Sequence, residues 1–191
     1  MIHQETELQT FTEKQLLDQM IYVSEASKDD FALKKENNMP LKIVPKDEMV
    51  NTVGTKLEPT PWIEVSQERI NTFADCTGDH YFIHVDVEKA KQTDLGGTIA
   101  HGLLTLALLP NLMENFIVPE NMVHGLNYGF DKVRFLAPVH SGKRIRVHGD
   151  VLDVRWKEEN HCVFKVGMTV EIEGEEKPAL YAEWINYFIT E

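Results

Sequence analysis

Residues 102–113 have the sequence GLLTLALLPNLM, and the expected architecture follows from this stretch. Apolar side chains occupy nearly every side of the helix that it predicts, so this helix should begin near Gly102 and lie inside the protein. Pro110 removes a backbone hydrogen bond, which predicts a kink or an early end of the helix at that point. The longest apolar run, from Leu103 to Leu109, is far shorter than the roughly 20 residues that a bilayer crossing needs, so it predicts a core element.

Long antiparallel strands are expected after Pro119, because the hydrophobic period changes there from helical to two. One strand shows the alternation most clearly, and its inward-facing residues are Cys162, Phe164, Val166, Met168, Val170 and Ile172. In the preceding strand the apolar residues change from odd-numbered to even-numbered positions near Gly149 and Asp150. This change predicts a β-bulge or a bend at these two residues.

Shorter elements precede the central helix. Residues 62–65 are strand-like, and Ser66 is placed to cap a helix that Gly78 ends. A second short helix is expected after Asp86. The segment between these two helices, residues 77–86, is expected to be a loop.

One buried helix followed by antiparallel strands can pack by wrapping a curved sheet around the helix, so we predict an α+β hot-dog fold. Because such a sheet keeps exposed edges, a homodimer is expected. We divide the chain into an N-terminal helical extension or arm, residues 1–58, and a hot-dog domain, residues 59–191. The arm is mostly polar, with one helix expected to start near Thr12.

Composition limits the classes of function. The 191 residues suffice for one domain with a sizeable core, and the formal net charge of −12 argues against nucleic acid as a general partner. Neither a signal peptide nor a membrane span is indicated, so we expect a cytoplasmic protein. The two cysteines, Cys76 and Cys162, lack zinc-ligand spacing and are expected to be buried reduced thiols.

The groups best suited to proton transfer cluster in TGDHYFIHVD, residues 77–86. A carboxylate such as Asp79 and an imidazole such as His84 can together hold one water molecule and move its proton, as the hydration of an activated double bond requires. Taken singly, Asp79 could instead cap a turn and His84 could be a hydrogen-bonded core histidine. His80 and His84 have the spacing of a helical metal pair, but the segment is not helical in pattern and shows no third ligand, so no metal site is predicted.

A second candidate feature is GGTIAHG, residues 96–102, which leads directly into the central helix. Free backbone N–H groups converge at a helix N-terminus, and the N–H of Gly102 is placed to stabilise negative charge on a thioester oxygen. For His101 a structural hydrogen bond is favoured over a catalytic role.

Residues 73–86, FADCTGDHYFIHVD, together with residues 96–102 resemble the signature of the MaoC-like dehydratases, which include the (R)-specific enoyl-CoA hydratases, and in particular the branch that contains the nodulation protein NodN. The similarity covers roughly residues 60–190. It implies that Asp79 is the general base, His84 its partner and Gly102 the oxyanion donor. It also implies a hot-dog fold, an acyl-CoA thioester substrate and a homodimer with the acyl pocket near the subunit interface.

The chain departs from the usual family pattern at two places. Tyr81 and Phe82 stand where the family has Asn-Pro, and Pro110 stands at the spacing where some hydratases place a serine that supports the catalytic histidine. His84 is therefore expected to have a different orienting partner.

The resulting hypothesis is the (R)-specific hydration of trans-2-enoyl-CoA, or the reverse dehydration of 3-hydroxyacyl-CoA. Two alternatives stay open: a non-catalytic module that binds acyl-CoA or a partner protein, and an acyl-CoA thioesterase. No cofactor is expected, because coenzyme A is part of the substrate. The predicted substrate-binding residues are Tyr81, Phe82, Ala100 and His101, with Lys132 and Arg134 for the coenzyme A phosphates and Lys143, Arg144 and Arg146 as further basic candidates.

Overall fold

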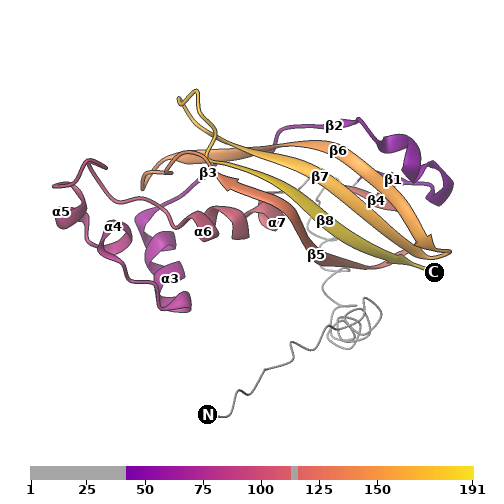
Figure 1. Ribbon diagram of the computed structural model, residues 1–191, viewed down its shortest axis with the longest axis horizontal. Coiled ribbons are helices and arrows are strands. Elements are labelled where there is room, and N and C mark those ends of the chain that lie inside the picture. Colours follow the sequence, from indigo (N-terminus) through magenta and orange to yellow (C-terminus); the bar gives the residue numbers. More distant parts are fainter. Residues whose placement is uncertain (1–41, 113–115) are drawn as a thin grey trace, which may run out of the picture. The chain divides into compact units, whose positions relative to one another are not determined.

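The computed structural model describes residues 42–112 and 116–191 (Figure 1). These residues belong to one compact unit, Pro40–Glu191. The helix that the sequence predicts near Thr12 lies outside the described residues. Within the described residues, no helix combines the length and the apolar character needed to cross a membrane.

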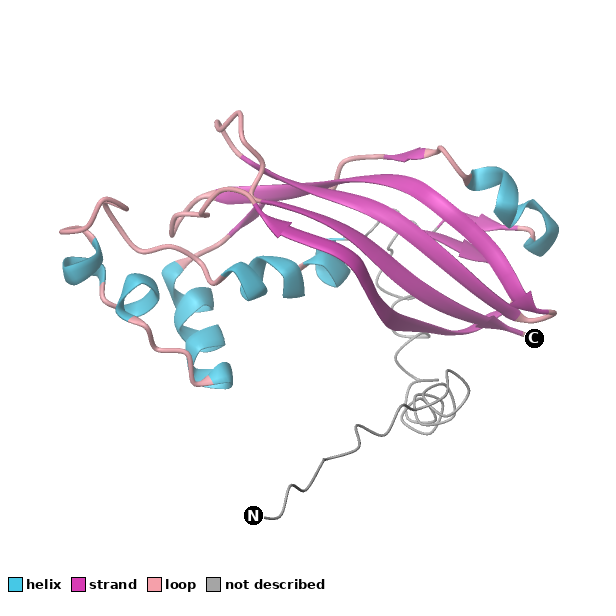
Figure 2. Cartoon of the chain, viewed as in Figure 1, coloured by secondary structure: helices cyan, strands magenta, loops and turns pink. Residues whose placement is uncertain are grey.

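A six-stranded antiparallel sheet forms the body of this unit, with the strand order β2-β6-β7-β8-β5 and β3 also paired with β6. Its strands are β2 (Lys56–Leu57), β3 (Ile63–Glu64), β5 (Met122–Phe135), β6 (Arg144–Glu158), β7 (His161–Ile172) and β8 (Leu180–Thr190). Figure 2 shows the four long strands as one curved layer that arches over a short run of helix. This is the hot-dog fold that the sequence predicts.

The alternation predicted for β7 is confirmed, since all six inward residues are no more than 2% exposed. The position predicted for the bulge in β6 is wrong. Gly149 pairs in regular register with Met168, and the register shifts lie further along the strand, between Val151 and Asp153 and between Trp156 and Glu158. Gly149 lacks a side chain for another reason: a Cβ atom there would lie 2.8 Å from Cδ1 of Leu57, which β2 brings across it.

Residues 42–57, assigned above to the arm, form regular elements of the compact unit. β1 (Lys42–Val44) pairs in parallel with β4 (Ile117–Pro119), and a 3₁₀ helix, η2 (Lys46–Thr52), leads into β2. Because β2 pairs with β6, this segment extends one edge of the large sheet.

The helices before the central one begin and end where the sequence predicts, with one addition. The Ser66 side chain caps α3 (Gln67–Thr77), and Gly78 ends it in the left-handed conformation with φ of 79°. Asp86 caps α5 (Val87–Ala90). The intervening segment is not entirely a loop, because it contains the short helix α4 (Phe82–Val85).

The central helix is shorter and less enclosed than predicted. It divides into α6 (Gly102–Ala107) and α7 (Leu109–Leu112), with the break at Leu108, just before Pro110. The sheet buries Leu104 and Leu109, but the side chain of Leu103 on the opposite face is 62% exposed. The prediction of burial on nearly every side is therefore wrong for this single chain, because its sheet covers only one side of the helix.

The two cysteines should differ sharply in reactivity. Burial, assisted by the nearby carboxylate of Asp153, raises the pKa of the Cys162 thiol to about 12, whereas Cys76 on α3 is exposed, contrary to the prediction for that residue. Iodoacetamide at about pH 8 should alkylate Cys76 in the native protein and Cys162 only after unfolding, because the thiolate is the nucleophile. Mass spectrometry of the labelled peptides measures this. Native Cys76→Ser should stay unlabelled, and equal labelling of both cysteines in the native protein would contradict the assignment.

Candidate active site

An apolar cavity of about 280 Å³ lies where the central helix begins beneath the end of the sheet. Its lining comes from α4, from the stretch that leads into α6 together with the start of that helix, from the end of β5 with the turn after it, and from the residue before β8. The residues that line it are His84, Ile99, Ala100, Gly102, Thr105, Phe135, Leu136, Ala137, Pro138, Val139 and Ala179. Only two of these side chains are polar, so a group bound here would meet mostly hydrocarbon and a few polar atoms, as in ligand pockets generally.

His84 has the orienting partner that the sequence left unidentified. Its Nδ1 lies 2.7 Å from the carbonyl oxygen of Ile99. A carbonyl oxygen only accepts hydrogen bonds, so Nδ1 carries the hydrogen, and in the uncharged ring the lone pair is on Nε2. The side chain is 9% exposed and borders the cavity, which makes Nε2 a hydrogen-bond acceptor for a water molecule or substrate.

Asp79 lies beside His84. A carboxylate oxygen of Asp79 and ring nitrogens of His84 and His101 all lie within 4.8 Å of one another. The remaining surroundings of this carboxylate are polar. Its Oδ1 accepts a hydrogen bond of 3.3 Å from the Tyr81 N–H, and the Asp79 side chain is 57% exposed to solvent. The structure thus brings the predicted pair together, with Asp79 in contact with solvent and His84 on the cavity.

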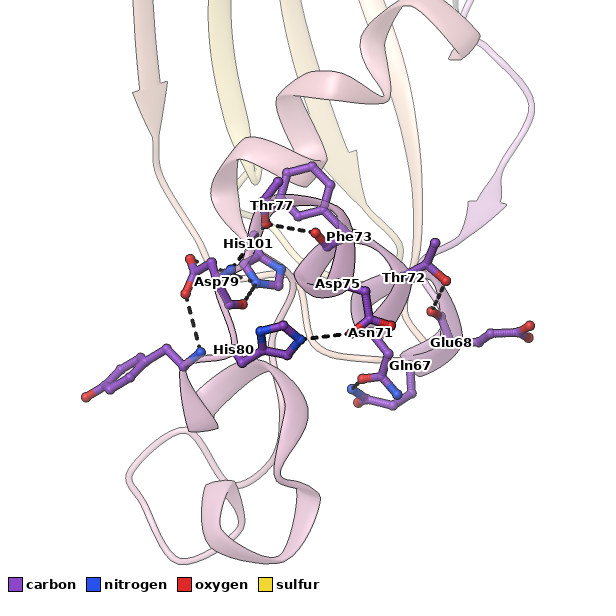
Figure 3. Close-up of polar contacts among 11 residues, drawn as sticks. Gln67, Glu68, Asn71, Thr72, Phe73, Asp75, Thr77, Asp79, His80 and His101 are labelled. Carbon is purple, nitrogen blue, oxygen red and sulfur yellow. Dashed lines mark hydrogen bonds and ion pairs between the residues drawn. The ribbon is translucent and has the colours of Figure 1, made fainter.

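His101 is buried against both groups. Its Nε2 lies 2.9 Å from the backbone carbonyl oxygen of Asp79, and its ring stacks on the ring of His84 with centroids 3.8 Å apart. Figure 3 shows His101 beside Asp79, whereas the neighbouring His80 turns toward Asp75. The hydrogen bond with Asp75 raises the pKa of His80 above its ordinary value and holds this exposed ring away from the cluster.

The prediction that no metal is bound stays a prediction, and the geometry of the two rings bears on it. Asp79, His84 and His101 bring three possible ligand atoms within 4.8 Å of one another. Nδ1 of His84 and Nε2 of His101 each carry a hydrogen that is donated to a backbone carbonyl, so only the other nitrogen of each ring could bind a metal ion.

Gln67 connects the segments that carry these groups. Its side-chain nitrogen donates to the carbonyl of His84 at 2.7 Å, and its oxygen accepts from the Thr98 hydroxyl at 2.6 Å. The first residue of α3 is thereby joined both to α4 and to the stretch that enters α6. Nothing in the local sequence indicates this role.

Gly102 lies on the cavity, as predicted, at the first position of α6. The backbone N–H groups of a helix's first turn have no acceptor within the helix, so this donor is available. Cδ1 of Phe135 would lie 3.0 Å from a Cβ atom at position 102, so the aromatic ring packs directly on the glycine. The absence of a side chain at this position allows that close approach.

Several predicted substrate-binding residues lie away from the cavity. Of the four on the helical side, only Ala100 is among its lining residues. Tyr81 is 58% exposed, and the ring of Phe82 packs against Tyr81 and beneath the ammonium group of Lys89. The aromatic pair that replaces Asn-Pro thus contributes its backbone to the site, through the Tyr81 N–H, and turns its rings elsewhere.

The five basic candidates fall into two groups. Lys143, Arg144 and Arg146 form ion pairs with Glu175, Glu173 and Glu171 respectively, and these pairs hold the pKa of each glutamate below its ordinary value. Neither Lys132 nor Arg134 has a carboxylate partner among the described residues. Both lie on β5 and alternate with Val133 and Phe135, so they face the side of the strand opposite the cavity.

The sequence did not identify Thr105 and the turn at residues 136–139 as parts of the site. Thr105 is 3% exposed and borders the cavity three residues after Gly102. A hydroxyl within an otherwise apolar helical run was the available signal for this residue. The apolar turn carried no comparable signal, because a short apolar stretch after a strand also suits the core.

Comparison with known proteins assigns the family. The sequence model described as "MaoC like domain" matches residues 48–172. The chain belongs to this MaoC-like family. It is 41% identical to 3-hydroxyacyl-thioester dehydratase Z of Mycobacterium tuberculosis over an alignment of 142 residues. This alignment covers 74% of this chain and 94% of that protein. It is 46% identical over 136 residues to nodulation protein N of Rhizobium meliloti, covering 70% of this chain and 84% of that protein.

Solved structures place the MaoC-like chain in the same fold. The R-hydratase PhaJ1 from Pseudomonas aeruginosa superposes with a TM-score of 0.59 at 22% identity, over 73% of this chain and 83% of that one. The (R)-hydratase from A. caviae gives a TM-score of 0.55 at 19% identity, over 70% of this chain and 94% of that one. These similarities establish the hot-dog architecture.

Proposed function

We propose that this MaoC-like chain is a hydro-lyase that hydrates trans-2-enoyl-CoA to (R)-3-hydroxyacyl-CoA and catalyses the reverse dehydration. The observation that carries the proposal is the placement of the Asp79 carboxylate within 4.8 Å of a His84 ring nitrogen, with His84 and Gly102 on one apolar cavity. The relative named 3-hydroxyacyl-thioester dehydratase Z supports the class of substrate.

These positions support the following reaction path. Asp79 and Nε2 of His84 hold one water molecule. As the oxygen of this water molecule bonds to C3 of the enoyl thioester, the Asp79 carboxylate accepts one of the water protons. The electron pair of the C2=C3 bond moves toward the thioester carbonyl, whose oxygen becomes negative and is stabilised by the Gly102 N–H. Transfer of the accepted proton to C2 completes the addition of one water molecule.

The surroundings suit the rest of the substrate. An apolar lining favours an acyl chain, because burial of hydrocarbon is the main source of binding energy in such a pocket. Coenzyme A also carries phosphates, and Lys132 and Arg134 are the two basic candidates without a carboxylate partner among the described residues. They lie on the edge strand β5, on the side of the strand opposite the cavity, so coenzyme A would have to pass over this edge to reach them. We assign them to the phosphates.

The central test is direct hydration. Purified protein should remove the conjugated enoyl absorbance of short and medium trans-2-enoyl-CoA esters, and chiral analysis should find the (R) product. Asp79→Asn and His84→Ala should each lower kcat by about 10²- to 10⁴-fold, because each removes a positioned group that handles the water proton. His80→Ala is the matched control, since this exposed histidine pairs with Asp75 and should leave the rate unchanged.

Three outcomes would contradict the proposal. Full rates in both Asp79→Asn and His84→Ala would remove the mechanism. Release of free thiol from saturated acyl-CoA would indicate a thioesterase. Binding of acyl-CoA by calorimetry, with no turnover of any enoyl ester, would indicate a non-catalytic module.

The packing of Phe135 on Gly102 gives a second test. Gly102→Ala should lower kcat by about tenfold or more, because the new methyl group displaces the Phe135 ring and disturbs the oxyanion donor, whose complete loss typically costs about 10²–10³. The control is Gly97→Ala, where no atom lies within 4 Å of the added Cβ. Rates of hydration measure both. Adding Phe135→Leu should restore part of the loss, and an unimpaired Gly102→Ala enzyme would exclude this glycine as the donor.

We propose further that the chain forms a homodimer through the face that its own sheet leaves open. The β5 strand, Met122–Phe135, is at an edge of the sheet, and the exposed apolar side chains of Leu103 and Phe135 adjoin the cavity region. Analytical ultracentrifugation should give a dimer. Leu103→Glu should shift it toward monomer because a charge would be buried at the interface, whereas Val50→Glu, an exposed apolar site on η2, should not. A wild-type monomer at micromolar concentration would contradict the proposal.

A further inference from the structure

His101 is a buried imidazole for which the proposed chemistry has no acid or base role. It is 4% exposed and is not among the residues that line the cavity, although the sequence suggested substrate binding. One face of its ring stacks on His84, and Phe73 packs against it with centroids 5.1 Å apart. The ring is therefore fixed between α3 and α4 at the residue that precedes α6.

The hydrogen bonding of His101 defines one form of the ring. Nε2 must carry a hydrogen because its partner, the Asp79 carbonyl, only accepts. Nδ1 is buried and has no hydrogen-bond partner among the described residues. The uncharged ring places a lone pair at Nδ1, whereas a second hydrogen there would be a buried donor without an acceptor, which is costly.

We propose that His101 is a positioning residue that sets the separation between the two groups that handle water. The hydrogen bond fixes the Asp79 peptide, and the stacked ring limits movement of the His84 imidazole. The expected effect of His101 on the rate rests on the proposed hydratase function. The anchoring of the Asp79 peptide by the His101 hydrogen bond does not depend on that function.

The chain around Asp79 needs such an anchor. Gly78, which precedes it, ends α3 with φ of 79°, and the Asp79 side chain is 57% exposed, so packing alone does not hold the carboxylate. The other hydrogen bonds of this stretch of backbone are long: the His80 N–H donates to the Gly78 carbonyl at 3.2 Å, and the Asp79 N–H donates to the Thr77 hydroxyl at 3.4 Å. A misplacement of about 1 Å at a reacting group can cost about 10²-fold in rate, so loss of the anchor should be visible in kcat.

Two substitutions separate the two contacts. His101→Gln keeps an N–H donor at nearly the position of Nε2 but removes the ring. His101→Phe keeps a ring that can stack on His84 but removes the donor. We expect His101→Phe to lower kcat by about 10- to 100-fold, with KM within about threefold of wild type. His101→Gln should recover a substantial part of kcat.

A second measurement follows the hydrogen bond without substrate. The amide nitrogen of His80 belongs to the same peptide group as the Asp79 carbonyl, so its NMR chemical shift responds when that carbonyl loses its donor. The full-length ¹⁵N-labelled protein should show a changed His80 shift in His101→Phe and a nearly unchanged one in His101→Gln. Thermal unfolding controls for stability, and His101→Asn, whose amide is too short to reach the carbonyl, replaces His101→Phe if that variant does not fold.

The outcomes distinguish the two proposals. Wild-type hydration together with unchanged kcat in both variants would overturn the positioning role, as would a rise in KM at constant kcat, which would make His101 a substrate-binding residue. An unchanged His80 shift in His101→Phe would exclude the anchoring hydrogen bond. If the wild-type protein hydrates no enoyl ester but the His80 shift behaves as expected, the hydratase proposal fails while the anchoring of Asp79 is supported.

Discussion

The hydrogen bond from Nδ1 of His84 to the carbonyl of Ile99 is the contact on which the site depends. It is accompanied by a backbone hydrogen bond of 3.0 Å from the Ile99 N–H to the Ile83 carbonyl, so α4 is joined at two points to the stretch that enters α6. Because a carbonyl oxygen accepts but never donates, the same contact fixes the tautomer of His84 and directs the basic nitrogen to the rest of the site. The same hydrogen bond therefore holds α4 in position and determines which ring nitrogen of His84 carries the hydrogen.

The elements that the sequence predicts well are those governed by local rules. The inward set of β7 follows from alternation along a half-buried strand, and the ends of α3 follow from a side-chain cap at Ser66 and the left-handed conformation of Gly78. The errors arise where distant segments intervene. Gly149 looked like a bulge because nothing nearby in the sequence reveals that Leu57 crosses it, and the exposed face of α6 depends on how much of the helix one sheet can cover.

The site shows the same division. The spacing between Asp79 and His84, and the position of Gly102, could be predicted because they lie in short segments with a recognisable pattern. The groups that hold them could not be predicted, because Ile99, Gln67 and His101 act over 15, 17 and 22 residues of sequence separation. In each of these contacts one partner is a backbone carbonyl: that of His84 for Gln67, that of Asp79 for His101, and that of Ile99 itself. Every residue has such a carbonyl, so the residue type at that position gives no sign of the contact.

The phosphates and the acyl chain of the proposed substrate are expected to contribute unequally to binding. The chain has a net charge of −12, and three of its five candidate phosphate ligands already neutralise glutamates that lie on β7 or just after it. Repulsion between exposed charges is screened over about 8 Å at physiological ionic strength, so the overall negative charge does not prevent an anionic ligand from approaching. Because only two of these five candidates lack a carboxylate partner among the described residues, however, ionic contacts can supply little of the affinity. Binding must then come mainly from burial of the acyl chain in the apolar cavity, which places the strongest contacts next to the reacting carbons and beside the Asp79–His84 pair.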